Sequence, residues 1–85
     1  MNKTESVAAR LKYIMNQRGL KQVDVLNLAR PYCEKYNVKL AKNYLSQYCS
    51  GKNEPGKDIL NVLSLALDVN PAWLQGFDVP QEFSV

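Results

Sequence analysis

Apolar residues recur at helical spacing along most of this chain, and no stretch alternates apolar and polar residues as a half-buried strand would. Glycine and proline divide the pattern into short segments, which limits the fold to several short helices around one core. At 85 residues the chain can build one small core and no second one. We therefore expect an all-α, compact five-helix domain over residues 1–77, with residues 78–85 as a linker or C-terminal tail.

The expected helices are bounded by residues that favour helix ends. The first runs from Thr4 to Arg18, with Thr4 or Ser6 as its N-cap and Gly19 as its left-handed stop. The others are expected from Lys21-Gln22 to Asn37, from Ala41 to Ser50, after Pro55-Gly56 as far as Leu67, and from Ala72 to Gln75 behind Asn70-Pro71.

Pro31 lies inside the second expected helix and allows two interpretations. An interior proline loses a hydrogen bond and clashes with the preceding turn, so the helix either kinks at Pro31 or ends there and a new helix begins. We expect a continuous, kinked helix, because the apolar stripe keeps its phase across the proline. That stripe consists of Val25, Leu28, Ala29, Tyr32 and Tyr36.

Charge is distributed unevenly along the chain. All eleven lysines and arginines lie between Lys3 and Lys57 together with four acids, a net charge of +7. Residues 58–85 carry four acids and no base, a net charge of −4. Such asymmetry suggests a face made for a polyanion, although ordinary surface charge can also cluster by chance.

Several classes of protein are disfavoured by the composition. The N-terminus has no apolar signal segment, and no apolar stretch is long enough to span a membrane. The two cysteines, Cys33 and Cys49, fit small core residues in a reducing cytoplasm and are too few for a structural zinc site. Since the chain has no histidine, no paired carboxylates and no glycine-rich phosphate loop, we expect neither an enzyme nor a metal or other cofactor.

The segment from Ala41 to Ser50 carries the functional signal. Its apolar residues Leu45, Tyr48 and Cys49 share one side of a helix. The opposite side has amides and hydroxyls, which suit the edges of DNA bases better than an ordinary solvated face with paired charges does. We expect base contacts from Lys42, Asn43, Ser46 and Gln47.

Residues around this helix are candidates for phosphate contacts. Lys52 and Asn53 follow it in a glycine-containing turn, and Tyr44 has a hydroxyl that can reach a phosphate. Gln22 opens the preceding helix, where free N–H groups favour phosphate, but it can equally bond its own backbone. Lys39, just before the reading helix, is either a phosphate contact or a solvated lysine.

These residues lie in motifs that resemble the Cro/CI-type helix-turn-helix family, namely 19–22 (GLKQ), 45–48 (LSQY) and 51–55 (GKNEP). The likeness continues through Leu63, 66–70 (ALDVN) and Trp73-Leu74. Residues 72–80 (AWLQGFDVP) are similar to the end of the DNA-binding domain in CI repressors of temperate phages of Gram-positive bacteria, and 21–28 (KQVDVLNL) to the lactococcal type.

The resemblance covers about residues 4–80 and implies a lambda-repressor-like helix-turn-helix domain with an extended second helix. By position, it assigns DNA contacts to Gln22, Lys42, Asn43, Ser46 and Gln47. The chain departs from the general family in two ways. Eleven residues separate Ala29 from Ala41, where a compact unit has a turn of ~3–4 residues, an extension that lactococcal-type repressors share. In addition, Lys21 and Ala41 stand where the family often has a capping serine or threonine.

We therefore expect a transcriptional repressor that binds double-stranded DNA, a phage or prophage CI-like regulator at the nucleoid of a bacterial host. The alternative is a protein-interaction module, such as an antitoxin or a regulator bound by a small antirepressor protein. RNA binding is less favoured, because no exposed aromatic platform is evident. The operator is expected to have two-fold related half-sites. We expect oligomerisation through a C-terminal region beyond these residues, with the isolated domain monomeric or weakly dimeric.

Overall fold

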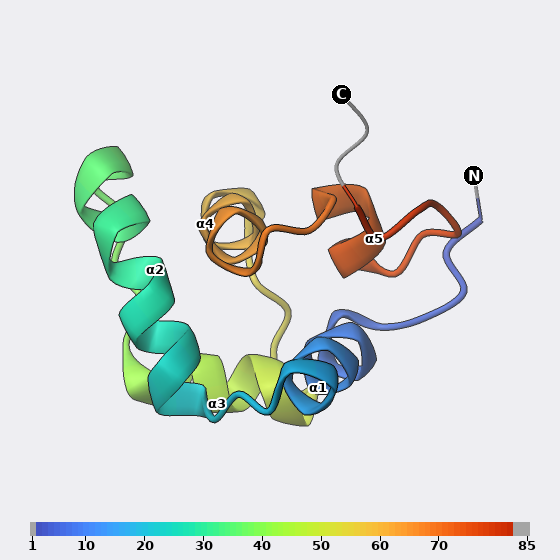
Figure 1. Cartoon of the computed structure of the whole chain (residues 1–85), viewed down its shortest axis with the longest axis horizontal. Coiled ribbons are helices and arrows are strands. Elements are labelled where there is room, and N and C mark those ends of the chain that lie inside the picture. Colours follow the sequence, from blue (N-terminus) through green and yellow to red (C-terminus); the bar gives the residue numbers. More distant parts are fainter. Residues whose placement is uncertain (1, 83–85) are drawn as a thin grey trace.

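The computed structural model describes residues 2–82, which form five α-helices around one core (Figure 1). Within that range the only β pairing is an isolated bridge between Lys3 and Phe77. The all-α, five-helix fold expected from the sequence is confirmed. The helices are α1 (Val7–Arg18), α2 (Gln22–Tyr36), α3 (Lys42–Ser50), α4 (Lys57–Leu67) and α5 (Pro71–Gln75).

The first helix begins later than its apolar pattern predicts. Ser6 is the N-cap, since its hydroxyl oxygen accepts a hydrogen bond of 3.1 Å from the backbone N–H of Ala9. Thr4 instead belongs to an extended N-terminal arm. Of the two caps that the sequence allows, Ser6 is therefore the correct one, and the start expected at Thr4 is wrong.

The second helix is continuous through Pro31, as expected. Pro31 and Asn27, whose carbonyl would otherwise accept a bond from residue 31, are both exposed, so water can satisfy that carbonyl. The helix ends at Asn37, which adopts a left-handed φ of 55°. Most of the long separation before α3 is thus helix, and the true connection comprises only residues 37–41.

The buried face of α2 is narrower than the apolar stripe. Val25 and Ala29 are fully buried, whereas Leu28 and Tyr36 are 44% and 46% exposed. The stripe therefore continues through Pro31, but only part of it faces the core. The helix continues to the edge of the molecule, where its last turns run past the region that the other helices cover (Figure 1).

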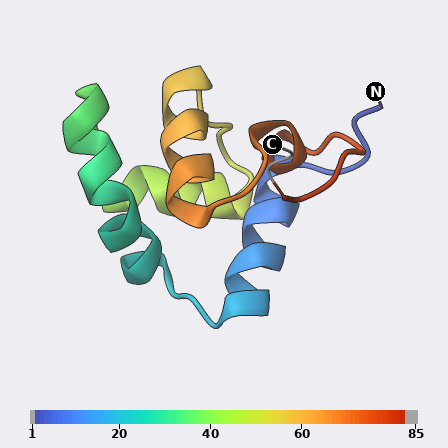
Figure 2. The ribbon, with the colours of Figure 1, turned by 45° about the horizontal axis from the view of Figure 1, so that its top comes forward.

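The core lies where all five helices meet. Helix α4 packs against α2 on one side and α5 on the other, while α3 packs against α1 and α2 (Figure 2). Trp73 is buried, as expected for a core anchor, and Cys49 is buried whereas Cys33 is only half-buried. The fully buried side chains include Leu11, Ile14, Val25, Leu45, Leu63, Leu67 and Leu74.

The N-terminal arm, residues 2–6, is hydrogen-bonded to Gly76 at the end of α5. The carbonyl oxygen of Gly76 accepts hydrogen bonds from the N–H groups of Thr4 at 2.8 Å and Glu5 at 3.1 Å. Gly76 has a φ of 106°, and a Cβ placed on it would lie 1.8 Å from the Glu5 carbonyl oxygen. Only glycine therefore allows the two segments to approach this closely.

The segment after Phe77 also lies against the domain. The N–H of Asp78 donates to the Asn2 carbonyl at 2.9 Å, and the Gln81 carbonyl accepts from the N–H of Asn70 at 2.7 Å. Val79 is partly buried against the core. Residues 78–81 thus contact the domain, while 83–85 lie outside the described residues.

Candidate nucleic-acid interface

Helix α3 separates an apolar face from a polar one. Leu45, Tyr48 and Cys49 are buried against the domain. At one residue per ~100° of turn, Asn43 and Gln47 project from the opposite side. Asn43 is exposed and Gln47 is half-buried, and the other two expected base contacts, Lys42 and Ser46, are also exposed.

The N-terminus of α3 has no side-chain cap. Ala41 is the N-cap residue and offers no acceptor, so the first N–H groups of the helix remain open to an external partner. An uncapped helix start carries partial positive charge and attracts phosphate. The helix starts at Lys42, one residue later than Ala41.

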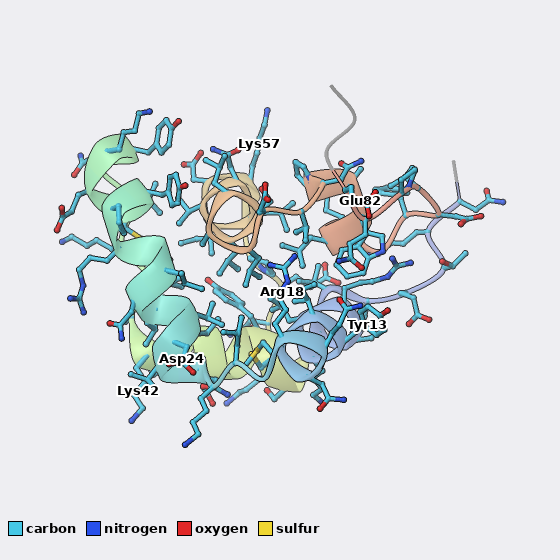
Figure 3. The ribbon with its side chains drawn as sticks, viewed as in Figure 1. Tyr13, Arg18, Asp24, Lys42, Lys57 and Glu82 are labelled. Carbon is cyan, nitrogen blue, oxygen red and sulfur yellow. The ribbon has the colours of Figure 1, made fainter. Side chains whose placement is uncertain are left out.

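The N-terminus of α2 is arranged differently. The Asp24 carboxylate accepts a 2.8 Å hydrogen bond from the N–H of Lys21, which satisfies part of this helix end internally. Gln22 is the first residue of the helix and is half-buried. Lys42 and Asp24 lie at the same edge of the molecule in the view of Figure 3, and α2 packs against α3.

The turn after α3 folds back onto the helix. The Gln47 carbonyl accepts hydrogen bonds from the N–H groups of Lys52 at 3.0 Å and Asn53 at 3.4 Å. It also accepts a 3.1 Å bond from the hydroxyl of Ser50. Gly51 makes this reversal with a φ of 83°. Lys52 and Asn53 are thereby placed beside the polar face, and both are exposed.

Asn53 makes a side-chain contact that the sequence does not predict. Its Nδ2 donates a hydrogen bond to Oε1 of Gln47, so two side chains expected in different roles are bonded to one another. This contact accounts for the partial burial of Gln47 in a helix face that is otherwise exposed. The structure therefore bonds Asn53, for which the sequence predicts a phosphate contact, to Gln47, for which it predicts a base contact.

The remaining expected phosphate contacts are more dispersed. Tyr44 is 51% exposed on the flank of α3. Lys39 is exposed in the connection that leads into α3. Gln22 is the first residue of α2, which packs against α3. The structure thus groups the expected residues on α3 and its following turn, with Gln22 and Lys39 at the margin.

Lys12 on α1 is a neighbour of this site that sequence reasoning missed. Burial raises the pKa of the Cys49 thiol above its ordinary value of 9.0, and the positive charge of Lys12 partly opposes that rise, so Lys12 lies near α3. A Cβ on Gly51 would lie 3.6 Å from Ala8, one turn before Lys12 on the same face. The exposed Lys12 ammonium thus extends the basic border of α3. Only the packing of α1 shows this, because the sequence does not say which side of α1 meets α3.

The acidic C-terminal part of the chain lies away from α3. The helices α4 and α5, which belong to the acidic part of the chain, lie on the side opposite α3 (Figure 1). Among residues 2–82 the one ion pair within 4 Å joins Lys3 to Glu54 at 3.7 Å. The lysines bordering α3 in this range are therefore not neutralised by neighbouring carboxylates.

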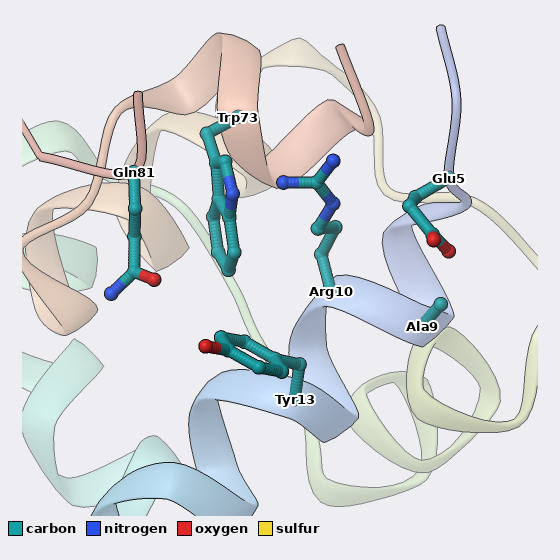
Figure 4. Close-up of a pocket in the computed structure, with 6 residues that line it drawn as sticks. All are labelled: Glu5, Ala9, Arg10, Tyr13, Trp73 and Gln81. Carbon is teal, nitrogen blue, oxygen red and sulfur yellow. The ribbon is translucent and has the colours of Figure 1, made fainter. Parts of the chain in front are cut away.

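A pocket lies between α1 and α5, away from α3 (Figure 4). It has a volume of about 380 Å³. The Arg10 guanidinium stands 4.7 Å from the centre of the Trp73 ring, and Tyr13 meets the same ring edge-on at 5.9 Å. These contacts fasten α5 to α1. The lining residues are Glu5, Ala9, Arg10, Tyr13, Trp73 and Gln81.

In the described part of the chain, no group of three or more metal-binding side chains gathers. None of the helices within residues 2–82 has the length and apolar character needed to cross a membrane. A comparison with protein-family models finds no match, and no curated protein is found to be similar to this chain.

Proposed function

We propose that this protein is a sequence-specific, double-stranded DNA-binding transcriptional repressor of the Cro/CI helix-turn-helix type, which reads the major groove with α3. In this proposal it is a phage or prophage CI-like regulator that acts in the cytoplasm of a bacterial host. The motif resemblance at residues 19–22, 45–48, 51–55 and 72–80 supports this assignment.

The observation that carries the proposal is the polar face of α3. It has amides and hydroxyls at its centre, no acid, an uncapped N-terminus at one end and Lys52 at the other. Amides and hydroxyls match the donor and acceptor pattern of base edges, whereas lysines and free helix N–H groups match phosphates. An α-helix also has the width that the major groove admits.

The dimensions of the domain suit one half-site. Its longest extent is 31 Å, and half-sites of two-fold operators lie ~34–36 Å apart on one face of the duplex. Two copies can therefore occupy successive half-sites without overlapping. A two-fold operator is the arrangement that we propose.

The test separates base reading from phosphate contact. Selection from random duplexes yields the operator, and binding is then titrated against operator and scrambled DNA at several salt concentrations. Gln47→Ala is expected to lose ~1–3 kcal/mol on the operator and little on scrambled DNA. Lys52→Ala is expected to weaken both duplexes by a similar factor and to reduce the salt slope by about one unit.

Lys57→Ala provides a matched control. Lys57 is exposed like Lys52 but lies at the edge of the molecule opposite Lys42 (Figure 3). Removing its charge is expected to leave the salt slope unchanged, because the effect requires contact with phosphate and not net charge alone. If neither Gln47→Ala nor Lys52→Ala changes binding to any duplex, the proposal is refuted.

An alternative function is supported by the surface of α2. This helix exposes three large apolar side chains, Val23, Leu28 and Tyr36, which are 44–55% accessible. A contiguous apolar patch is typical of a protein-binding surface, and Leu28 and Tyr36 lie within ~80° of each other around this helix. A protein-interaction module, such as an antitoxin or a regulator held by an antirepressor, is therefore the second candidate. Such a module would show no salt-sensitive binding to mixed duplex DNA.

A further inference from the structure

The side chain of Gln47 occupies the centre of the polar face of α3, yet one of its two hydrogen-bonding groups is already engaged. Its Oε1 accepts a hydrogen bond from Nδ2 of Asn53, in the turn after the helix. The same two residues are also joined through the backbone, where the N–H of Asn53 lies 3.4 Å from the Gln47 carbonyl oxygen. The amide of Gln47 is thus held in one orientation before any ligand arrives.

This orientation restricts what Gln47 can recognise. A free glutamine amide offers a donor and an acceptor side by side, the pair that adenine requires at N7 and N6. Oε1 is turned toward Asn53, so Nε2, which makes no hydrogen bond among the described residues and can only donate, is the group left for a base. Guanine presents two acceptors and no donor on its major-groove edge, at N7 and O6, whereas thymine presents a single acceptor beside a methyl group.

We infer that Asn53 is a positioning residue that sets the amide of Gln47 as a donor, so that Gln47 selects guanine at its base pair. This inference rests on the proposed DNA-binding function and specifies one element of its sequence preference. Asn53 acts through Gln47 and requires no contact with the base.

The contact can be changed without unfolding the domain. Asn53 is exposed, and its side chain makes no other hydrogen bond among the described residues. The turn is held to α3 by backbone bonds from Lys52 and Asn53 to Gln47, which substitutions of the Asn53 side chain leave in place. Melting temperatures of the variants are therefore expected to stay close to that of the unaltered protein.

Two substitutions test the inference with opposite signatures. Asn53→Ala frees the amide of Gln47, and the preference for guanine at one base pair is expected to fall by roughly tenfold. Asn53→Asp places an acceptor where a donor stood, so Gln47 must turn its Nε2 toward the carboxylate and its Oε1 toward the DNA. The preferred base is then expected to change to one that presents a donor, cytosine or adenine. Affinities for four operators that differ only at this base pair give both results.

Lys52→Gln controls for the charge that Asn53→Asp introduces. Both variants lower the net charge of the same turn by one, but Lys52→Gln leaves the bond between Asn53 and Gln47 intact. It is expected to weaken all four operators equally and to keep the preference for guanine. A shift of preference in Lys52→Gln would mean that charge, and not amide orientation, sets the base.

The free protein offers a readout that needs no DNA. The side-chain amide resonances of Gln47 in NMR spectra are expected to shift in Asn53→Ala, and amide exchange at Nδ2 of Asn53 in the unaltered protein is expected to be slowed. If the unaltered protein selects an operator but both Asn53 variants retain its base preference, the inference is overturned while DNA reading stands. If the unaltered protein selects no DNA sequence, the proposed function fails and this inference fails with it.

Discussion

Replacing Gly76 by alanine tests how the N-terminal arm is held. A left-handed backbone costs alanine roughly 1–2 kcal/mol relative to glycine. The new Cβ would also lie 1.8 Å from the Glu5 carbonyl oxygen, a distance that only movement of the backbone can relieve. That movement breaks the hydrogen bonds from Thr4 and Glu5 to Gly76, worth ~0.5–1.5 kcal/mol each. We therefore expect Gly76→Ala to lose about 2–5 kcal/mol of unfolding free energy.

Two other glycines provide matched controls. Gly19 has a φ of 64° and open space around its missing Cβ, so Gly19→Ala should show the backbone cost alone. Gly56 has an ordinary φ of −69° and equally open surroundings, so Gly56→Ala should change stability by less than about 1 kcal/mol. Thermal unfolding followed by the fluorescence of the single, buried Trp73 ranks the three variants.

The comparison of Gly76→Ala with Gly19→Ala isolates the close approach. A difference of ~1–3 kcal/mol in a domain of this size separates the two melting temperatures by roughly 4–20 °C. Equal melting temperatures would show that the arm is not held against Gly76 in solution. The tertiary junction described above would then be incorrect.

Three further predictions concern the core and the thiols. Leu45→Ala should lower the unfolding free energy in urea by ~2–5 kcal/mol because Leu45 is fully buried, whereas Ser46→Ala should change it little. Equal losses would mean that α3 is rotated from the orientation described. Burial raises the pKa of the Cys49 thiol above 9.0, so this thiol ionises first in the unfolded chain and the unfolding free energy should fall as pH rises beyond 9. Cys49→Ala should reduce this pH dependence. An unchanged pH dependence would contradict the burial of Cys49. In the native protein a thiol reagent should modify the half-buried Cys33 well before the buried Cys49, and the reverse order in mass spectra of singly labelled protein would contradict the packing of α3.

Helix positions could be predicted because their signals are local. Gly19, Asn37 and Gly51 end helices through their own backbone conformations, and Asn70-Pro71 begins one through a side-chain bond and a fixed φ. The start of α1 cannot be predicted from the sequence, because Thr4 and Ser6 can each act as an N-cap. The arm that Gly76 holds decides between them, and Gly76 is distant in sequence.

The candidate site was also predicted in part. Leu45 and Gln47 are two positions apart in one helix and therefore lie on opposite sides of it, so the polar face of α3 follows from spacing alone. The bond between Asn53 and Gln47 does not follow, because it depends on how the turn after Gly51 folds back. The position of Lys12 beside α3 could not be predicted either, because it depends on how α1 packs against α3.

The sequence by itself therefore determined the five helices, their approximate ends and the polar character of one face of α3, since these depend on residues within a few positions of each other. Tertiary structure decided which apolar residues are covered. Leu28 and Tyr36 share the spacing of an apolar stripe yet remain exposed. Leu28 lies on the flank of that stripe, and Tyr36 ends α2, whose last turns run past the other helices. Tertiary structure also decided which groups come together across the chain, as Gly76 approaches Glu5 and the charge of Lys12 acts on the Cys49 thiol, because such neighbours arise only when segments far apart in sequence pack together.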